Sequence, residues 1–365
     1  MIIGVPTEGM EDEFRVAIGP SGVQALTGHG HKVIIEAGAG LVSGVGDDDY
    51  QDAGADIAKT GKDVWESAEF ILKVREPEGP ELDMVSDHTI FSYLHLAANE
   101  KLTRKLLDNN VTAIAYETVQ TDEGLLPLLS PMSEVCGRLA IKVGAYGLEK
   151  ISGGMGVLIS GVSGVPPVKV VIIGGGVAGF NAATVATGIG ATVVILGVSP
   201  KKLRYAADML RGRAVTVMSN RANIEEQVLT ADLVIGAALI PGAKTPMLIS
   251  RNLVSRMKPG SVIVDLSIDQ GGVAETSRPT TNKNPFFVEE GVVHYGVPNM
   301  PGAVPRTSSF ALTSATITYV LELAEKGFDG AVETNPDLRR GVNIHKGTVT
   351  HGGVAEAFGL PLGSL

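Results

Sequence analysis

The chain has 365 residues, 44% of them hydrophobic and 46 of them glycine, which is enough for two globular domains with sizeable cores. Its net charge of -10 and its lack of a lysine- or arginine-rich block argue against nucleic acid and anionic membranes as partners. The single cysteine, Cys136, excludes an internal disulfide, and we find neither a secretory signal nor a run of about 20 apolar residues. We therefore expect a cytoplasmic protein with no membrane partner.

Short runs rich in valine and isoleucine alternate with helical patterns in the first third of the chain. Runs of this kind, without strict in-and-out alternation, are typical of parallel strands that are covered on both faces. The pattern therefore predicts an α/β domain. Its expected strands are Ile2–Val5, Lys32–Glu36, Phe70–Val74, Ile90–Leu94 and Thr112–Tyr116.

A long helix is expected next, at Ser133–Lys150, with Ser133 as its N-cap. Val135, Leu139 and Val143 recur there at helical spacing. A second series of buried runs follows and predicts another sheet of the same kind. Its expected strands are Val168–Ile173, Thr192–Leu196, Val215–Met218, Leu233–Ile235, Val262–Leu266 and Val292–Tyr295.

A second long helix is expected at Thr307–Lys326, after the second series of strands, and it could return the chain to the first domain. We therefore predict two Rossmann-like, doubly wound α/β domains, one inserted into the other. Residues 1–129 and 306–365 are expected to form a substrate domain, and residues 130–305 a dinucleotide-binding domain. The segment from Gly341 onward gives no clear pattern.

The glycine-rich segment Gly174–Gly179 fits the pattern G-x-G-x-x-G through Gly174, Gly176 and Gly179, with Val177 and Ala178 between the last two. Alone, this pattern is weak, but here it follows an expected strand, opens a helical pattern and precedes another strand. Glycines at these positions permit a tight turn and close approach of a pyrophosphate to a helix N-terminus. The alternative, a turn with a glycine-packed helix, is less consistent with this context.

The position that reads the ribose departs from the usual pattern. An NAD-selective site places an acidic residue at the end of the second strand, about 20 residues on. Here that strand ends at Gly197, and Ser199, Lys201, Lys202 and Arg204 follow. A hydroxyl group with nearby cations suits the 2′-phosphate of NADP. In the alternative interpretation the cations begin a solvated helix, and NAD binds through the remaining contacts.

Polar residues follow several expected strands, where α/β proteins place their active sites. Lys73 closes one strand and His95 follows another; Asp269 follows a strand of the second series, and Arg15 lies after the first strand. Arginine grips a carboxylate in two places, and histidine titrates near neutral pH. This set suits the oxidation of an amino acid.

Each of these residues also has a structural interpretation. His95 could be a satisfied structural histidine, Lys73 a solvated strand end, and Arg15 a surface partner of Glu13, while Arg75 is an equal candidate on composition. The other histidines lack the spacing of metal ligands, so we expect no metal site.

At these residues the sequence resembles the alanine dehydrogenase family, over almost its whole length. The matching segments, in order, are GVPTE, EFRVAI, LKVREP, FSYLHLAAN, AIAYETV, LLSPMSEVCGRLA, GGGVAGFNAA, ADLVIGAALIPGAK, MKPGSVIVDLSIDQGG and HYGVPNMPGAVPRTS. The resemblance implies reversible conversion of L-alanine to pyruvate and ammonium with NAD or NADP, in a homo-oligomer that is a hexamer.

The resemblance also implies roles for individual residues. Arg15 and Lys73 would bind the substrate, His95 would be the general acid and base, and Asp269 would assist it. The cofactor would lie against Ser133 and Asn299, together with the positions Gly174, Gly176, Val177, Ala178, Gly179, Gly197, Ser199 and Lys202.

The family alternative is the nucleotide-binding subunit of a proton-translocating transhydrogenase. Its members generally lack the histidine and the aspartate that stand here as His95 and Asp269. A dehydrogenase for another small 2-amino acid is the alternative within the class. Gly197 is the clear departure, because the family normally has an aspartate there, and Lys201 stands where many members carry an acid. The resemblance therefore predicts NAD as the cofactor. The glycine at position 197 predicts that NADP is also accepted.

Overall fold

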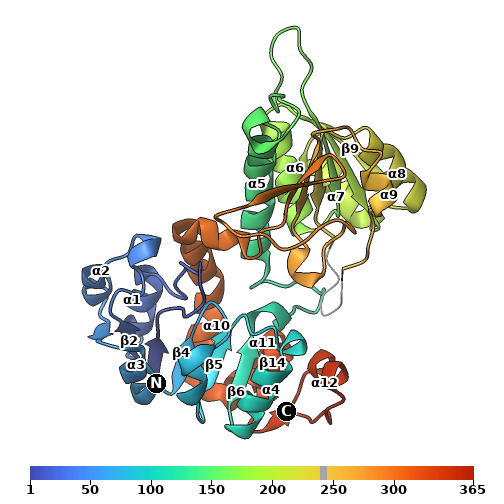
Figure 1. Cartoon of the computed structure of the whole chain (residues 1–365). Coiled ribbons are helices and arrows are strands. Elements are labelled where there is room, and N and C mark those ends of the chain that lie inside the picture. Colours follow the sequence, from blue (N-terminus) through green and yellow to red (C-terminus); the bar gives the residue numbers. More distant parts are fainter. Residues whose placement is uncertain (239–244) are drawn as a thin grey trace. The chain divides into compact units, whose positions relative to one another are not determined.

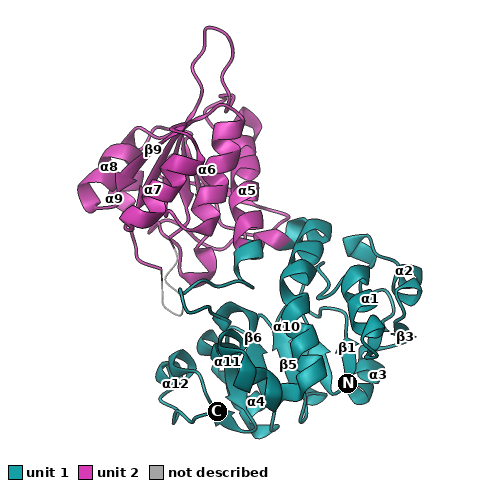
Figure 2. Cartoon of the chain, turned by 180° about the vertical axis from the view of Figure 1, so that it is seen from behind, with its two compact units in different colours: residues 1–132, 302–365 teal, residues 133–301 magenta. Residues whose placement is uncertain are grey.

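The computed structural model describes residues 1–238 and 245–365 and divides into two compact units (Figure 2). Unit 1 comprises residues 1–132 and 302–365, and unit 2 comprises residues 133–301. The chain therefore leaves unit 1, forms unit 2 and then returns. The sequence places these two crossings after residues 129 and 305. Residues 239–244, which belong to the ADLVIGAALIPGAK segment, lie outside the described residues.

Unit 1 is built on a sheet with the strand order β15-β14-β6-β5-β4-β1-β2-β3 (Figure 1). From β1 to β6 the strands are parallel and follow the order 3-2-1-4-5-6 of a doubly wound fold, whereas β14 and β15 pair antiparallel. The strands are β1 Ile2–Val5, β2 Lys32–Glu36, β3 Asp56–Ala58, β4 Phe70–Leu72, β5 Thr89–Ser92, β6 Thr112–Ala115, β14 Val342–His345 and β15 Thr348–Val349.

Helices cover both faces of this sheet. One face packs its apolar residues against α1 and α10, and the other packs against α3 and α4. The returning helix α10 is also tied to the loop after β1, because Ser309 Oγ accepts from the Val16 amide at 2.9 Å. The helices of unit 1 are α1 Pro20–Gly28, α2 Asp47–Asp52, α3 Gly61–Ser67, α4 Glu100–Asp108, α10 Pro305–Thr334, α11 Pro336–Gly341 and α12 Gly352–Phe358.

Unit 2 repeats the plan, with the strand order β12-β13-β11-β10-β7-β8-β9. Its strands are parallel except for the edge strand β12, which pairs antiparallel with β13. The strands are β7 Lys169–Ile173, β8 Thr192–Gly197, β9 Ala214–Met218, β10 Leu233–Gly236, β11 Val262–Asp265, β12 Phe286–Glu289 and β13 Val292–Tyr295. The helices are α5 Ser130–Gly147, which begins at the unit boundary, α6 Val177–Gly188, α7 Pro200–Met209, α8 Arg221–Leu229 and α9 Arg251–Val254.

The two sheets and the inserted arrangement confirm the expected fold class, with corrections at element ends. Helix α5 begins at Ser130, so Ser133 lies inside its first turn and is not the N-cap. Pro131 is tolerated in that turn because the first amides of a helix have no intrahelical partner. Strands β4 and β5 end earlier than expected, so Lys73 follows its strand instead of closing it.

The remaining differences lie where the apolar pattern is short or interrupted. Helix α10 continues past Lys326 to Thr334 with one non-helical residue, Gly327, at φ 68°. The short strands β3, β12, β14 and β15 were not expected, and β14, β15 and α12 occupy the segment that shows no clear pattern. Within the described residues, no helix is both long and apolar enough to span a membrane.

Candidate active site

Lys73 lies directly after β4, at the carboxyl edge of the sheet where the strand order reverses between β1 and β4. Its side chain is fully buried, so it is not a solvated strand end. Its Nζ donates to Glu81 Oε1 at 2.8 Å and lies 3.3 Å from Glu8 Oε2. Burial disfavours the charged ammonium, but the two glutamates outweigh it, and the pKa of Lys73 is raised.

Arg15 follows β1 and is also buried, with 4% of its surface exposed. Glu13 holds the guanidinium on two sides, accepting from Nε at 2.7 Å and from Nη2 at 2.5 Å, while Nη1 is directed at Met132 Sδ at 3.3 Å. The pairing with Glu13 is therefore real, but it is an interior ion pair and not a surface one. It fixes the orientation of a group that binds carboxylates well.

Removal of Lys73 is expected to destabilise unit 1 because it leaves the buried carboxyl groups of Glu8 and Glu81 without their cation. Breaking a buried ion pair costs about 3–5 kcal/mol, so Lys73→Ala should lower the free energy of unfolding by about that amount. The matched control is Lys62→Ala, whose exposed pair with Glu66 is worth at most about 1 kcal/mol. Urea titrations of the two variants measure their free energies of unfolding. Equal values would contradict the assignment of Lys73 to a buried ion pair.

His95 follows β5 in a left-handed backbone conformation, with φ 48° and ψ 34°. A residue other than glycine adopts this region at some cost, so the surrounding contacts must hold it. Glu117 supplies those contacts, because its carboxylate accepts from the His95 amide at 2.7 Å and from the Leu94 amide at 3.2 Å. The His95 side chain remains 43% exposed and can therefore reach a ligand.

The imidazole of His95 is oriented by Glu76, whose Oε2 lies 3.4 Å from Nδ1. Partial burial opposes the charged imidazolium, but the hydrogen bond to Glu76 and the charge of Glu117 outweigh it, so the pKa of His95 is raised. Arg75, the other basic residue of this loop, pairs with Glu76 at 3.1 Å. With Nδ1 facing a carboxylate, Nε2 is the nitrogen left to exchange a proton with a substrate.

The glycine loop of unit 2 joins β7 to α6. Gly174 has φ 122°, and a Cβ there would lie 2.2 Å from Ala237 O; a Cβ on Gly179 would lie 1.8 Å from Gly174 O. Both positions therefore require glycine. Gly176 is different, because it is the N-cap of α6 and a Cβ there would meet nothing within 4 Å. The open space beside a helix N-terminus, which Val177 and Ala178 begin, fits a pyrophosphate.

Gly197 is the last residue of β8 and lies next to this loop, since a Cβ there would be 3.6 Å from the Gly175 amide nitrogen. Ser199 is the N-cap of α7, with its Oγ accepting from the Lys202 amide at 3.4 Å. The side chains of Lys201, Lys202 and Arg204 are exposed along that helix. The structure is therefore consistent with either interpretation of these cations.

The remaining candidates lie in unit 2. Asp269 is exposed in the short 3-10 helix Ile268–Gln270, beyond β11. Ser133 is half-buried in α5, and Asn299 has φ 55° just before the turn Met300–Ala303. Asp265, which the sequence did not single out, ends β11 fully buried and accepts from the Val273 amide at 2.8 Å and the Ser267 amide at 3.1 Å. It holds the loop that carries Asp269.

Unit 1 thus brings Arg15, Lys73 and His95 to one edge of its sheet, and unit 2 carries the glycine loop, Gly197 and Asp269. The residues that sequence reasoning missed are the carboxylates that hold this set. They are Glu8, Glu76, Glu81, Glu117 and Asp265, whereas Glu13 was expected only as a surface partner of Arg15. Most of these carboxylates follow the end of a strand, and that position is the sequence feature that could have identified them.

Two Rossmann-like sheets, a glycine loop at a helix N-terminus and a histidine–lysine–arginine group define a nicotinamide-dinucleotide oxidoreductase. The family models for the N-terminal and C-terminal domains of "Alanine dehydrogenase/PNT" match residues 4–136 and 140–352. The chain belongs to this alanine dehydrogenase/PNT family.

Individual relatives cover nearly the full length. An alanine dehydrogenase of Staphylococcus haemolyticus is 54% identical, over 100% of this chain and 98% of its own length. A solved L-alanine dehydrogenase is 47% identical with a TM-score of 0.94, over 98% of this chain and 99% of its own. A transhydrogenase from Sinorhizobium meliloti is 27% identical with a TM-score of 0.81, over 96% of this chain and 99% of its own.

Proposed function

We propose that this protein is an alanine dehydrogenase, which reversibly converts L-alanine to pyruvate and ammonium and passes a hydride to a nicotinamide dinucleotide. The observation that carries the proposal is full-length identity of 54% to a protein of that name, with Arg15, Lys73 and His95 brought to one sheet edge. The transhydrogenase likeness is weaker, at 27% identity. His95 and Asp269 also favour the dehydrogenase.

The cofactor would be held by the glycine loop, because Gly176 leaves open the space that a side chain would fill. When bound, the nicotinamide supplies the hydride acceptor and donor. In unit 1 Arg15, oriented by Glu13, binds the substrate carboxylate, and Lys73 binds the carbonyl or amino end. His95 removes a proton from the water that attacks the imine carbon, and the resulting carbinolamine then loses ammonia as its C–N bond breaks, which leaves pyruvate. The same steps run backwards in the reverse direction. Asp269 assists His95 and orients the substrate nitrogen.

The pH dependence of alanine oxidation should report the raised pKa of His95, because His95 must be neutral to act as a base. Activity falls as the pH falls through that pKa. Glu76→Gln removes the carboxylate that favours the imidazolium, so the pKa of His95 drops and the acid limb of kcat/KM moves to lower pH. Profiles of kcat/KM for L-alanine against pH measure this, and an unmoved acid limb would exclude Glu76 as the partner of His95.

We propose that NADP is accepted alongside NAD. An aspartate at the end of β8 would accept hydrogen bonds from the ribose hydroxyls and repel a 2′-phosphate, and Gly197 does neither. A charged hydrogen bond from Ser199 or Lys201 to that phosphate would be worth about 1.5–3 kcal/mol. Exposure of the lysine limits this gain through screening.

Gly197→Asp is therefore expected to restore selectivity for NAD by at least about tenfold in kcat/KM, the equivalent of about 1.4 kcal/mol. A Cβ at this position comes within 3.0 Å of Leu203 Cδ2, which must move. Gly197→Ala makes the same contact without the charge and is the matched control. Measurements of kcat/KM with both cofactors separate the two effects. A hundredfold preference for NAD in the natural chain would contradict the NADP proposal.

We further propose a cytoplasmic homo-oligomer, with the hexamer that the family resemblance implies as its state. The support is an apolar segment between α5 and β7 that extends from the body of unit 2 (Figure 1). Its side chains Ile151, Leu158, Val162 and Val165 are 58–78% exposed in the single chain. Apolar surface of this kind marks an interface. The molar mass in solution tests the proposal, and a monomer would overturn it.

The direct test of the activity is the appearance of reduced cofactor when the purified protein is given L-alanine and NAD or NADP. We expect turnover with L-alanine and little with larger amino acids. The absence of reduced cofactor with L-alanine under any of these conditions would overturn the proposal.

A further inference from the structure

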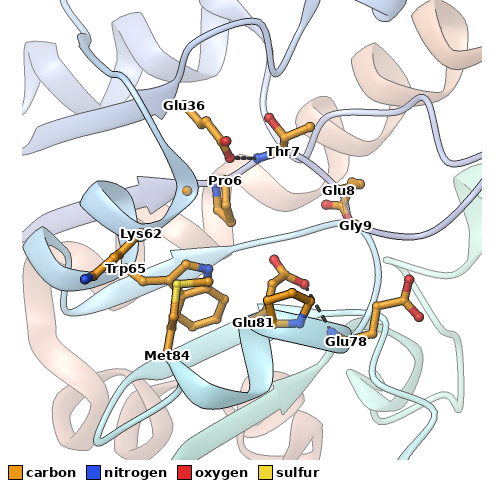
Figure 3. A pocket seen from close by; sticks show the side chains of 13 residues that line it. Pro6, Thr7, Glu8, Gly9, Glu36, Lys62, Trp65, Glu78, Glu81 and Met84 are labelled. Atoms are coloured by element: carbon orange, nitrogen blue, oxygen red, sulfur yellow. Dashed lines mark hydrogen bonds between the residues drawn. The ribbon is translucent and has the colours of Figure 1, made fainter.

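A pocket opens in unit 1 beyond the carboxyl end of β1, between α3 and residues 78–84 (Figure 3). Its volume is 630 Å³, room for a small organic molecule. Four glutamates line it, namely Glu8, Glu36, Glu78 and Glu81, together with Trp65 and Lys62. No described group of carboxylates or histidines in the chain is arranged as a metal site, so a metal ion does not explain these acids.

The independent sign of a ligand is Trp65. Its side chain is 1% exposed, yet its indole Nε1 has no hydrogen-bond partner among the described residues. In Figure 3 this nitrogen lies on the edge of the ring that faces Pro6 and Glu81, toward the pocket. A buried indole N–H without an acceptor loses the free energy of a hydrogen bond, and it can only donate. The pocket therefore calls for a ligand that brings an acceptor.

Lys73 already pairs with Glu8 and Glu81, so the glutamates of the lining that still call for a cation are Glu36 and Glu78. Lys62, the one lysine of the lining, is exposed and pairs with Glu66 outside the pocket at 3.5 Å, and its amine points away in Figure 3. Among the described residues, the carboxylate of Glu36 accepts a hydrogen bond only from the Thr7 amide, at 2.7 Å. Carboxylates with capacity for further hydrogen bonds recognise ammonium groups.

We propose that this pocket binds a cationic amino acid, with its ammonium groups on the glutamates and its carboxylate on the Trp65 N–H. The two demands exclude a simple diamine, which has no acceptor, and a simple carboxylic acid, which has no cation. This site differs from the one assigned to alanine, because Trp65, Glu36 and Glu78 belong to no part of that site.

A ligand in this pocket should change the rate of the reaction, because Glu8 and Glu81 line the pocket and also hold Lys73, at 3.3 and 2.8 Å. An ammonium group on these carboxylates competes with Lys73 and shifts the side chain that is proposed to bind the oxo acid. The coupling is reciprocal, so pyruvate with cofactor must weaken the second ligand by the same factor. This step rests on the proposed function, whereas binding itself does not.

Trp65 is the only tryptophan of the sequence, so its fluorescence reports on this pocket alone. The experiment titrates the full-length protein, without cofactor, with L-lysine and separately with 1,4-diaminobutane. We expect a saturable change in emission with L-lysine and binding at least about tenfold weaker for the diamine, which makes no bond to the indole. No change up to about 10 mM L-lysine, where a site with a Kd of about 1 mM is nearly filled, would overturn the proposal.

Variants then locate the site. Glu36→Gln should raise the Kd of L-lysine about tenfold, since one charged hydrogen bond is lost. Glu66→Gln, on the same helix α3 but outside the pocket, should leave the Kd unchanged. Trp65→Phe removes the donor, and calorimetry should show the preference for L-lysine over the diamine disappear. Equal Kd values in Glu36→Gln and Glu66→Gln would place the ligand elsewhere and overturn the proposal.

Discussion

Replacement of His95 by asparagine is expected to lower kcat by about 10²–10⁴-fold, the typical contribution of a general acid–base group. Asparagine tolerates the left-handed backbone that His95 adopts at φ 48°, so the variant removes the titrating ring without adding backbone strain. The proposed cofactor site is in unit 2, so cofactor affinity should stay within about twofold, a difference of about 0.4 kcal/mol.

The matched control for this variant is His29→Asn, since His29 is an exposed histidine of unit 1 whose ring contacts Ala25 O at 2.8 Å and Glu325 at 3.7 Å. It should keep full turnover. His95→Ala should lower kcat by the same factor, but alanine tolerates the left-handed backbone at this position less well than asparagine does. If His95→Asn retained more than about a tenth of the original kcat, the proton carrier would have to be another group.

Replacement of Gly179 by alanine is expected to abolish cofactor binding and to destabilise unit 2. The new Cβ would lie 1.8 Å from Gly174 O, so α6 or the loop must shift. Overpacking of this kind costs about 1–3 kcal/mol in stability, and the shift displaces the amides that face the pyrophosphate. Cofactor titration and thermal unfolding of the variant measure the two effects.

Two further glycines of the same loop and helix make this prediction specific. A Cβ on Gly176 meets nothing within 4 Å, so Gly176→Ala should fold normally and still bind the cofactor at least about tenfold more weakly, because the ligand needs that space. Gly188→Ala, at the far end of α6, should change neither property. Full cofactor affinity in Gly176→Ala would place the pyrophosphate away from this loop.

Much of the fold could be predicted because parallel strands that are buried on both faces leave continuous apolar runs. The strands from β7 to β11 and the loop before α6 were expected within one or two residues of their bounds. Short strands such as β12 and β14 were missed, because they have only four residues each and are only partly apolar. Ser133 was misplaced as an N-cap because a proline inside a first turn looks like a helix boundary in the sequence.

The polar cluster of unit 1 could be predicted only in part. Lys73 and His95 stand out because each follows a buried strand. Their partners do not, since Glu8 lies 65 residues from Lys73 and no local spacing connects them. Whether Arg15 and Glu13 form a surface pair or a buried one depends on the packing of α5 and α10 around the loop after β1, which a local pattern does not encode.

Formation of L-alanine from pyruvate requires ammonium and a hydride together, because the C2 carbon of pyruvate gains both the nitrogen and the hydride. The most direct measurement follows the absorbance of reduced cofactor with pyruvate and ammonium, given separately and together. We expect oxidation of the cofactor only when both are present, with L-alanine as the product. Oxidation with pyruvate alone would indicate a 2-hydroxy-acid dehydrogenase, and no oxidation with both present would contradict the assignment.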